Sequence, residues 1–528
     1  MREQVVVVGA GMVGHRFVEE LVARDREHRF DVHLVGAEEY EPYNRILLTE
    51  VLARRSDVAA LTLPRPPERV SVQRGTSATS VDREQRLVEL DDGTALGYDH
   101  LVLATGAHAF VPPIEGLRSS DGDEPPRHVH VLRTIDDCRD VVARTVNARH
   151  AVVLGGGVLG LEAACGLARR GLAVTVVHLD GHLMADQLDP AAAAVLAATL
   201  DDLGIRVHTS TSVAEVIGAY GELVAVRLTD GSVLATDLML VSCGIRPDLS
   251  LAAAAGLPTG RGVTVGPDLA SPVDPAIRAI GDCAEPPEGG TGLVAPGWEQ
   301  AARLARLMTS GVGEGGLDYP LASLAARPPS DEQLPEGVRL KAVGVDLVTR
   351  GVRGSGAAAD DRVLALADPQ ARRHVEVVVR RDRLVGFSCL GAPQVSAALS
   401  VAFDRRTPLP VDPATLLLPE TNLPDQRSDE ASPTLIPADA TICRCNGVSK
   451  SDLLGAWDAG CHTVEEMAAA TRATTGCGGC QETVCGLVDW LTTSDGTGES
   501  KGQPVRNTGE PSVAEAKHQA RSDEMQRS

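Results

Sequence analysis

A glycine-rich loop that directly follows a short apolar run occurs twice in this chain of 528 residues. The first loop is residues 9–14, Gly-Ala-Gly-Met-Val-Gly, and it follows the apolar run 4–8. The second is residues 155–160, Gly-Gly-Gly-Val-Leu-Gly, and it follows the apolar run 151–154. Glycine at the first, third and sixth positions allows a tight turn from strand to helix and a close approach of the backbone to a pyrophosphate. Two copies therefore predict two bound dinucleotides that exchange electrons.

The residues around both loops support this interpretation. After the first loop a helical pattern runs to about Arg24, a strand is expected over 31–35, and Glu38 then stands where an acid hydrogen-bonds a ribose hydroxyl. After the second loop a helix is expected over 161–169 and a strand over 173–177. A lone loop of this kind could be a tight structural turn, but the strands and helix around it favour nucleotide binding.

Composition and charge exclude several other functions. The apolar stretch 151–168 is long enough to suggest a transmembrane helix, but its three consecutive glycines and Glu162 favour a strand, a turn and a helix. No signal-peptide pattern is visible. Asp and Glu total 72 and Lys and Arg 50, so the net charge is −22, and such a surface repels nucleic acid and anionic membranes. We therefore expect a cytoplasmic protein of three or four domains, with no nucleic-acid or membrane partner.

Six of the eleven cysteines lie between residues 443 and 485, and four of these form two close pairs. The four are Cys443, Cys445, Cys477 and Cys480. Thiolates in two close pairs suit an iron–sulfur cluster or Zn²⁺, and in a cytoplasmic chain such a group is more often metal-binding than disulfide-bonded. Structural zinc and unligated thiols are the alternatives. Cys461 and Cys485 lie outside both pairs, so we assign them to packing, with Cys485 as the substitute ligand.

Two further segments, taken with the glycine loops, resemble a known superfamily. Residues 98–107 form an apolar strand that ends in Ala-Thr-Gly, and residues 277–282 form one that ends in Gly-Asp. In this order the four segments resemble the flavoprotein disulfide-reductase superfamily with two dinucleotide-binding domains. The resemblance implies an α/β fold with two nested Rossmann-like domains, the first for FAD and the second, inserted into it, for NAD(P). It also implies that the carboxylate of Asp282 holds the ribityl chain of FAD.

The same resemblance assigns residues to each nucleotide. For FAD it implies Gly9, Gly11, Gly14, Glu38, Arg45, Thr105, Gly106 and Asp282. For NAD(P) it implies Gly155, Gly157, Gly160 and Glu162. In relatives the position of Glu162 lies between the nicotinamide site and the flavin, and the alternative is a charge that only favours the helix N-terminus. The acid that usually selects NAD would fall at His178, and no arginine is placed for a 2′-phosphate, so NADH is favoured but the choice stays open.

The sequence also narrows the chemistry within that superfamily. No cysteine precedes Cys138, which argues against a disulfide reductase with a redox-active cysteine pair beside the flavin. Residues 42–48, Pro-Tyr-Asn-Arg-Ile-Leu-Leu, instead resemble the flavin-contact segment of the NAD(P)H-nitrite reductase large subunit and related flavoproteins. Further matches to that family are residues 183–189, 292–301 and 340–346. The resemblance implies that Arg45 lies by the FAD and offsets its charge; a surface arginine after a turn is the alternative.

The cysteine pairs carry a second resemblance. Cys-x-Cys-Asn with a later Cys-Gly-Gly-Cys resembles the small bacterioferritin-associated-ferredoxin-like domain, which binds [2Fe-2S], and it implies that all four cysteines are ligands. The expected domain boundaries are 1–125 with 245–315 for FAD, 126–244 for NAD(P), 320–405 for a small α+β interface domain, 406–438 for a Pro-rich linker, 439–491 for a small helical [2Fe-2S] domain and 492–528 for a disordered tail. Strands of the interface domain are expected over 339–346, 374–380 and 384–389.

Together these resemblances imply electron transfer from NAD(P)H through FAD to [2Fe-2S]. Hydride transfer needs positioning more than acid–base groups, so we name no catalytic acid or base. The nitrite reductase large subunit carries a further sirohaem module, for which no cysteine set follows Cys485. We therefore expect the electron-transfer subunit of an assimilatory nitrate reductase, with a molybdenum-containing nitrate reductase subunit as its partner.

Three other interpretations stay open at this stage. The acceptor could be a sirohaem nitrite reductase on a separate chain, or another terminal reductase or oxygenase. A different class is a non-catalytic interaction protein that senses redox state or iron. In the superfamily the interface domain is often a dimerisation surface, so a homodimer is one expected assembly.

Overall fold

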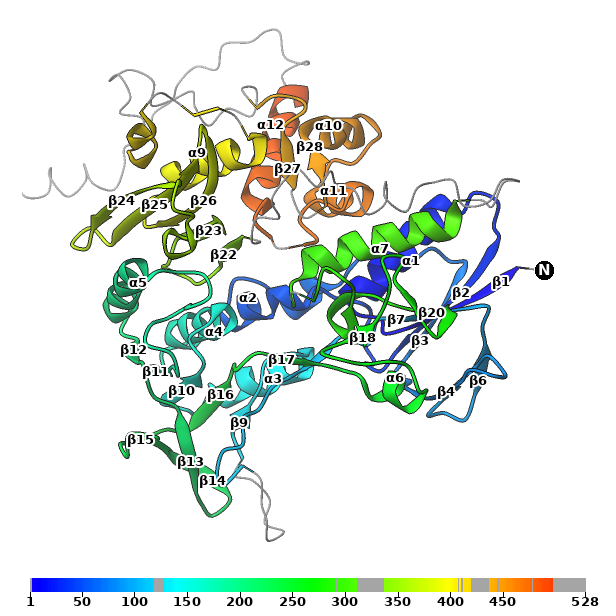
Figure 1. Ribbon diagram of the computed structural model, residues 1–528, viewed down its shortest axis with the longest axis horizontal. Coiled ribbons are helices and arrows are strands. Elements are labelled where there is room, and N and C mark those ends of the chain that lie inside the picture. Colours follow the sequence, from blue (N-terminus) through cyan, green and yellow to red (C-terminus); the bar gives the residue numbers. More distant parts are fainter. Residues whose placement is uncertain are drawn as a thin grey trace, which may run out of the picture. The chain divides into compact units, whose positions relative to one another are not determined.

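The computed structural model describes residues 2–117, 127–290, 292–310, 337–406, 408–409, 412–418, 436–443, 446–476 and 478–496. The chain divides into two compact units (Figure 1). The first unit is residues 1–428 with 475–478, and the second is residues 429–474 with 479–528. The domain boundaries expected within these units stay predictions.

A six-stranded sheet forms around the first glycine loop, in the order β19-β20-β7-β1-β2-β3. Its strands are β1 (Glu3–Val8), β2 (Phe30–Gly36), β3 (Val70–Arg74), β7 (His100–Leu103), β19 (Ala270–Ser271) and β20 (Asp274–Ala279). β1 is parallel to β2 and β7, and β7 is parallel to β20. Val5, Val6 and Val7 are all buried, so both faces of β1 are covered, which explains its continuous apolar run. The helix α1 (Met12–Arg24) follows the loop and packs against α7 (Val294–Thr309) (Figure 1).

These elements confirm the expected strand over 4–8, the helix to Arg24 and the strand over 31–35. Two other expected strands end earlier than the sequence predicted. Of the strand expected over 98–107, only β7 (residues 100–103) is present. Of the strand expected over 277–282, only residues 277–279 are present, as the end of β20. The short elements beyond them are β8 (Ala107–Ala109), which pairs with β17 (Ile245–Pro247), and η3 (Gly281–Cys283). Gly106 and Gly281 have φ of +74° and +78°, which ends an extended strand in each case.

A five-stranded parallel sheet forms around the second glycine loop, in the order β12-β11-β10-β16-β9. Its strands are β9 (Val129–His130), β10 (His150–Leu154), β11 (Ala173–Val177), β12 (Arg206–His208) and β16 (Leu238–Val241). The helices beside it are α3 (Ile135–Arg144), α4 (Val158–Arg169) and α5 (Pro190–Asp202). The apolar stretch 151–168 is thus a strand, a loop and a helix, as the sequence predicted. Within the described residues, no helix combines the length and apolar character needed to cross a bilayer.

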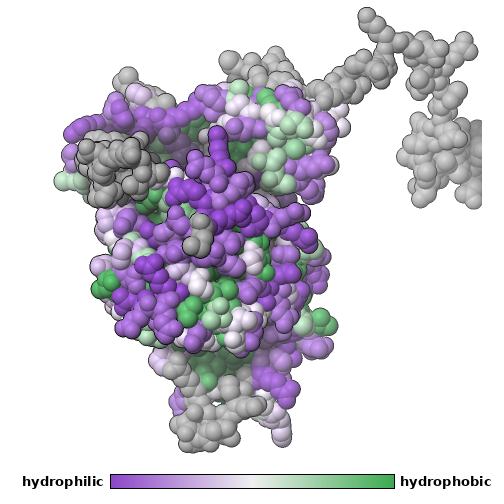
Figure 2. Space-filling model, turned by 90° about the vertical axis from the view of Figure 1, so that its right-hand side faces the viewer, coloured by the Kyte–Doolittle hydropathy of each residue, from purple (hydrophilic) through white to green (hydrophobic). Residues whose placement is uncertain are grey.

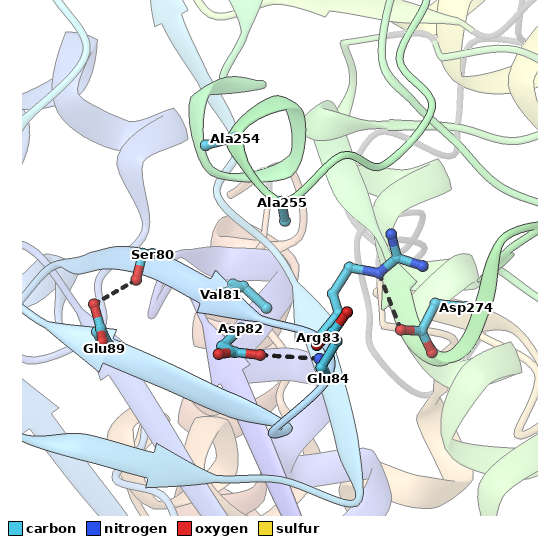
Figure 3. A pocket seen from close by; sticks show the side chains of 9 residues that line it. All are labelled: Ser80, Val81, Asp82, Arg83, Glu84, Glu89, Ala254, Ala255 and Asp274. Carbon is cyan, nitrogen blue, oxygen red and sulfur yellow. Dashed lines mark hydrogen bonds and ion pairs between the residues drawn. The ribbon is translucent and has the colours of Figure 1, made fainter.

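Two small antiparallel sheets accompany the two large ones. They consist of β4 (Ala78–Asp82), β5 (Leu87–Leu90) and β6 (Ala95–Gly97), and of β13 (Val213–Ala219), β14 (Glu222–Leu228) and β15 (Val233–Ala235). A polar pocket of about 650 Å³ lies between β4, β5 and the helix α6 (Ser250–Ala254) (Figure 3). Arg83 crosses it to Asp274, with 3.2 Å between Nε and Oδ2. None of the predicted site residues lines this pocket, so we do not treat it as a cofactor site.

The interface part is a five-stranded antiparallel sheet in the order β22-β23-β26-β25-β24, with α9 (Pro393–Arg405) packed on β26. Its strands are β22 (Val338–Leu340), β23 (Leu347–Gly351), β24 (Arg362–Asp368), β25 (Arg373–Arg380) and β26 (Arg383–Leu390). The expected strands over 374–380 and 384–389 are confirmed. The one over 339–346 is right only at residues 339–340, which belong to β22. A turn follows over 341–346, where the Val345 amide donates to the Ala342 carbonyl at 3.0 Å and Gly344 has φ of +87°.

The segment expected as a linker begins with a packed piece. Residues of η5 (Pro413–Leu417) form a short 3-10 helix, and Leu417 is buried against the interface sheet. The stretch 419–435 lies outside the described residues. The expected tail begins within a helix, since α12 runs to Gly496, and its remainder also lies outside the described residues.

The described residues of the second unit form three helices and a short strand pair. Its elements are β27 (Thr441–Cys443), β28 (Val448–Ser449), α10 (Lys450–Asp458), α11 (Val464–Thr471) and α12 (Gln481–Gly496). Capping boxes begin α10 at Ser449 and α11 at Thr463, so the sequence itself fixes where both helices start. Their buried faces meet around Leu453, Met467 and Leu487.

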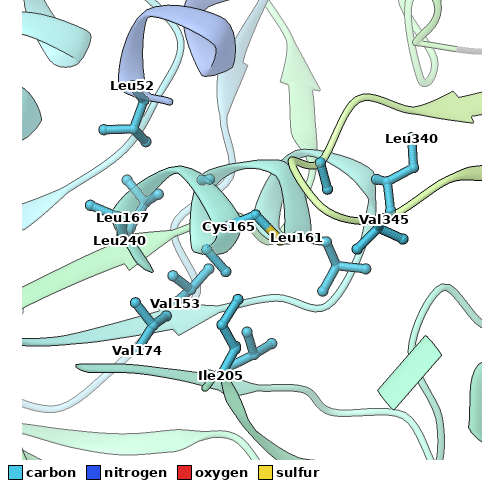
Figure 4. Packing of buried hydrophobic residues seen from close by; sticks show 14 of the residues in the cluster. Leu52, Val153, Leu161, Cys165, Leu167, Val174, Ile205, Leu240, Leu340 and Val345 are labelled. Atoms are coloured by element: carbon cyan, nitrogen blue, oxygen red, sulfur yellow. The ribbon is translucent and has the colours of Figure 1, made fainter. Parts of the chain in front are cut away.

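The three parts of the first unit share one hydrophobic cluster (Figure 4). Leu52 belongs to the part with the first loop, Leu161 and Leu167 to α4, and Leu340 and Val345 to the interface part. By contrast, the surface shown in Figure 2 is mostly hydrophilic, with small separated apolar patches. This hydrophobic cluster therefore includes residues from all three parts of the first unit instead of lying within one part.

Shortening a side chain in this shared cluster should destabilise the first unit strongly. Leu167 is 0% exposed, so Leu167→Ala should lower the free energy of unfolding by about 2–5 kcal/mol through lost burial and a cavity. Leu179 is 68% exposed, and Leu179→Ala is the matched control with little expected change. Urea unfolding of both variants measures the difference; equal losses would contradict the shared core.

Candidate cofactor sites

Both glycine loops are held in the same way by close backbone contacts. Gly9 has φ of +113°, and a Cβ atom there would lie 2.1 Å from the Ala104 carbonyl oxygen. A Cβ at Gly14 would lie 2.0 Å from the Gly9 oxygen. In the second loop, a Cβ at Gly155 would lie 2.1 Å from the Ser242 oxygen, and one at Gly160 would lie 2.0 Å from the Gly155 oxygen. No side chain fits at these positions, so glycine is required by packing of the loop itself.

The middle glycine of each loop begins a helix whose N-terminus is open to an anion. Gly11 is the N-cap of α1 and Gly157 is the N-cap of α4; neither helix has a side-chain cap or an acidic residue in its first turn. A Cβ at Gly157 would meet nothing within 4 Å, and one at Gly11 would meet only Arg45 Nη2, at 3.6 Å. Uncapped N–H groups beside open space suit a pyrophosphate. These residues therefore fit FAD at the first loop and NAD(P) at the second.

The other predicted FAD residues converge on the same edge of the first sheet. Thr105 and Gly106 follow β7, which pairs with β1, and Asp282 follows β20, which pairs with β7, so all three lie at carboxyl ends of strands on one edge of this sheet. Parallel sheets bind ligands at this edge. Asp282 accepts a hydrogen bond from Arg133 Nη2 at 2.7 Å, and Arg133 Nε donates to the Ala107 carbonyl at 3.1 Å. Arg133 follows β9 and belongs to no recognised motif, so no sequence pattern pointed to it.

Glu38 and Arg45 meet each other beyond the end of β2. Arg45 Nη2 lies 3.0 Å from Glu38 Oε1, and the Tyr43 hydroxyl donates to Glu38 Oε2 at 2.7 Å. Burial raises the pKa of Tyr43 above its usual range, so the phenol stays a hydrogen-bond donor. Arg45 is therefore a partly buried, ion-paired residue beside the first glycine loop. We propose that this pair faces the adenosine and pyrophosphate end of FAD.

Glu162 is a buried carboxylate that is bound from two other parts of the first unit. Its side chain is 4% exposed, on the helix that follows the second loop. Thr49 Oγ1 donates to Oε2 at 2.7 Å, and the Lys341 amide donates to Oε1 at 3.0 Å. Lys341 Nζ also lies 3.5 Å from Oε1. Neither Thr49 nor Lys341 was among the predicted site residues, although the matched segment 340–346 contains the lysine.

His178, where an NAD-selecting acid was expected, instead supports the second glycine loop. Its Nδ1 accepts the Gly156 N–H at 3.1 Å, and its Nε2 lies 3.5 Å from Asp180 Oδ2. Burial lowers the pKa of His178, which favours the neutral ring that this acceptor role requires. The structure therefore gives the residue a role in loop geometry, and it leaves the choice between NADH and NADPH open.

Two of the four predicted cluster ligands, Cys443 and Cys480, lie among the described residues of the second unit. Cys443 and Cys480 are buried in its core. The Thr474 amide donates to Cys480 Sγ at 3.3 Å, and Asn446 Nδ2 donates to Cys443 Sγ at 3.6 Å, so both sulfurs act as acceptors. Cys461 is half-buried and packs against the core. The predictions for Cys445 and Cys477 fall outside the described residues. Four thiolates suit a [2Fe-2S] cluster, and Cys443, Cys445, Cys477 and Cys480 stay its proposed ligands.

A methyl group at Gly157 should weaken nucleotide binding without disturbing the fold. The position has ordinary backbone angles and open space, so Gly157→Ala removes only room for the pyrophosphate. We expect the Kd for NAD⁺ to rise at least about tenfold, a loss of about 1.4 kcal/mol, while FAD content stays constant. Isothermal titration calorimetry gives the Kd. Gly97→Ala is the control, because Gly97 is exposed on β6 and a Cβ there would meet only Leu87 Cδ2, at 3.9 Å. Similar Kd values in both variants would refute the assignment.

Comparison with protein families identifies both halves of this arrangement. The model of the pyridine nucleotide-disulphide oxidoreductases matches residues 3–304. The model of the BFD-like [2Fe-2S] binding domain matches residues 441–490. These matches confirm the predicted fold class and the predicted cofactors, FAD, NAD(P)H and [2Fe-2S].

Individual relatives agree with the family matches. The nitrite reductase [NAD(P)H] large subunit of Klebsiella oxytoca is 34% identical over 497 residues, covering 93% of this chain and 49% of the relative. The assimilatory nitrate reductase electron transfer subunit of Bacillus subtilis is 31% identical over 509 residues, covering 94% of this chain and 61% of the relative. The chain thus spans about half to three fifths of these relatives.

A solved structure agrees with the fold of the first unit. The ferredoxin reductase for the CYP199A2 system of Rhodopseudomonas palustris has a TM-score of 0.63 at 26% identity, covering 79% of this chain and all of that one. The family model itself matches more than half of the chain, from before the first glycine loop into α7. This chain therefore belongs to the pyridine nucleotide-disulphide oxidoreductase family.

Proposed function

We propose that the protein is an NAD(P)H-dependent electron-transfer flavoprotein that supplies a separate terminal reductase. The observation that carries the proposal is the presence, in one chain, of two dinucleotide loops and a match to a [2Fe-2S] domain. When bound, FAD accepts two electrons at a time and the [2Fe-2S] cluster carries one, so together they convert a hydride into single electrons. A protein that only bound nucleotides would need no such cluster.

The residues of the first unit bind and orient the two nucleotides. The N-termini of α1 and α4 hold the pyrophosphates through backbone N–H groups. Arg133 keeps Asp282 directed along the edge where the ribityl chain would lie, and Glu162 lies between the part that binds NAD(P) and the part that binds FAD. Hydride transfer needs alignment more than proton transfer, so these positioning contacts are enough for the reaction without a catalytic acid or base.

For the acceptor, we propose the molybdenum-containing catalytic subunit of an assimilatory nitrate reductase. The support is the relative of that name in Bacillus subtilis. The match covers 61% of that relative but 49% of the nitrite reductase large subunit of Klebsiella oxytoca. A sirohaem nitrite reductase is the second candidate, favoured by the slightly higher identity to the nitrite reductase. A redox or iron sensor would bind the same cofactors but turn over very slowly.

Loss of one cysteine ligand should separate the two halves of the electron path. We expect anaerobically purified protein to show flavin absorption with about two Fe and two sulfide per chain, bleached by NADH. Cys443→Ser should lose the iron and the reduction of cytochrome c but keep FAD and its bleaching by NADH. Cys461→Ser, outside the two pairs, should keep both activities. Zinc in place of iron in the parent protein would remove the one-electron outlet and contradict the proposal.

The identity of the acceptor can be read from the product. Mixed with a molybdenum nitrate reductase subunit, nitrate and NADH, the protein should form nitrite, whereas the Cys443→Ser variant should not. The parallel reaction with a sirohaem nitrite reductase and nitrite should give no ammonium above that control. Ammonium from the second mixture together with no nitrite from the first would overturn the nitrate assignment and favour the second candidate.

A further inference from the structure

Helices α2 (Leu48–Leu52) and α4 pack against each other, and Glu162 lies at one end of this contact. A Cβ at Gly166 of α4 would lie 3.2 Å from Leu52, so the two helices pack with no room for a side chain there. At the far end, Arg170 donates to the carbonyls of Leu52 and Val51 at the end of α2. Thr49 and Glu162 close the near end through their 2.7 Å hydrogen bond. α2 follows the Arg45 segment, and α4 begins at the second glycine loop.

Lys341 adds a third part of the fold to this joint. It lies in the turn between β22 and β23, where Leu340, Ala342 and Val345 are buried in the shared cluster. Both its backbone amide and its ammonium group approach the same oxygen of Glu162, at 3.0 and 3.5 Å. Because the flanking residues are anchored in the core, the lysine is held in place by the backbone as well as by its own ion pair.

The charges around Lys341 explain why a cation is needed there. Glu50, next to Thr49 on α2, is half-buried, and burial raises its pKa; Glu162 raises it further, while Arg55 and Lys341 lower it. Arg55 Nε lies 3.1 Å from Glu50 Oε2. Among the described residues, Lys341 is the one cation within ion-pair distance of Glu162. Without it, a buried carboxylate would face a second carboxylate with only hydrogen bonds to hold it.

We propose that Lys341 is a positioning residue for hydride transfer. Together with Thr49, it fixes the Glu162 carboxylate between the two nucleotide-binding parts, and so holds the nicotinamide end of one site against the flavin end of the other. The interface part thereby contributes directly to the redox centre. This inference rests on the proposed function, since it assumes that NAD(P)H reduces FAD in this chain. A displacement of about 1 Å at such a centre can cost about 100-fold in rate.

The test is Lys341→Met, which removes the ammonium but keeps the backbone hydrogen bond to Glu162. Anaerobic stopped-flow bleaching of the flavin by NADH gives a limiting rate and a half-saturating concentration. We expect the limiting rate to fall about 10- to 100-fold, with the half-saturating NADH concentration and the calorimetric Kd for NAD⁺ changed less than about threefold. Lys341→Arg should recover most of the rate. Arg339→Met, an exposed cation on β22, is the matched control and should behave like the parent protein.

Two measurements separate positioning from mere stability. The midpoint of thermal unfolding and hydrogen exchange across residues 48–52 report on folding and on the α2–α4 contact without turnover. Because Lys341→Met leaves a buried carboxylate without its ion pair, we expect a lower midpoint and faster exchange, with the protein still folded at the temperature of the rate measurement. If Lys341→Met loses FAD, Thr49→Val takes its place as the test, because it removes the hydrogen bond to the other oxygen of Glu162. A slower limiting rate in Thr49→Val would then support the proposal.

Several outcomes would overturn the inference. An unchanged limiting rate in Lys341→Met, or in Thr49→Val where the first variant fails to fold, removes the positioning role. A raised NAD⁺ Kd with a normal limiting rate would make Lys341 part of nucleotide binding instead. If neither NADH nor NADPH bleaches the flavin of the parent protein, the proposed function itself fails, and that result is distinct from all of these.

Discussion

Backbone contact between each glycine loop and the strand beside it constrains the rest of the first unit. The Gly9 α-carbon stands against the Ala104 carbonyl, and Gly155 stands in the same way against Ser242. Because the chain must turn within this space, each helix starts directly at a strand end and its N–H groups point along the carboxyl edge of the sheet. The positions of Asp282, Thr105 and the two helix N-termini all follow from this approach.

Much of this architecture could be predicted from local sequence because its determinants are local. Glycine spacing, apolar runs buried on both faces and the order of motifs identified both sheets and the helices after each loop. The residues that were missed have no local signal. Arg133 and Lys341 act on Asp282 and Glu162, partners 149 and 179 positions away in the chain. Only the folded structure brings such pairs together, and no spacing rule predicts them.

The strand expected over 339–346, of which only the first two residues are in β22, shows a second limit of sequence patterns. Its mixture of apolar residues resembles a buried strand, but Ala342 and Val345 lie in a turn and are buried in the shared cluster. The positive φ of Gly344 allows the turn, and a glycine in an apolar run signals this only weakly. The start of the expected linker was missed for a similar reason. The segment is rich in proline, which suggests a linker, but its Leu417 is buried against the interface sheet.

The shared cluster also affects how this protein could be recombined. Nested nucleotide-binding domains look like exchangeable modules when they are read along the chain. Here, excising the inserted segment would strip apolar cover from Leu52 on one side and from Leu340 and Val345 on the other. A graft from a relative would have to carry matching surfaces for both neighbours. The nucleotide-binding parts therefore do not fold independently of each other, although they are separate along the sequence. Altering nucleotide preference is better attempted by point substitution than by domain exchange.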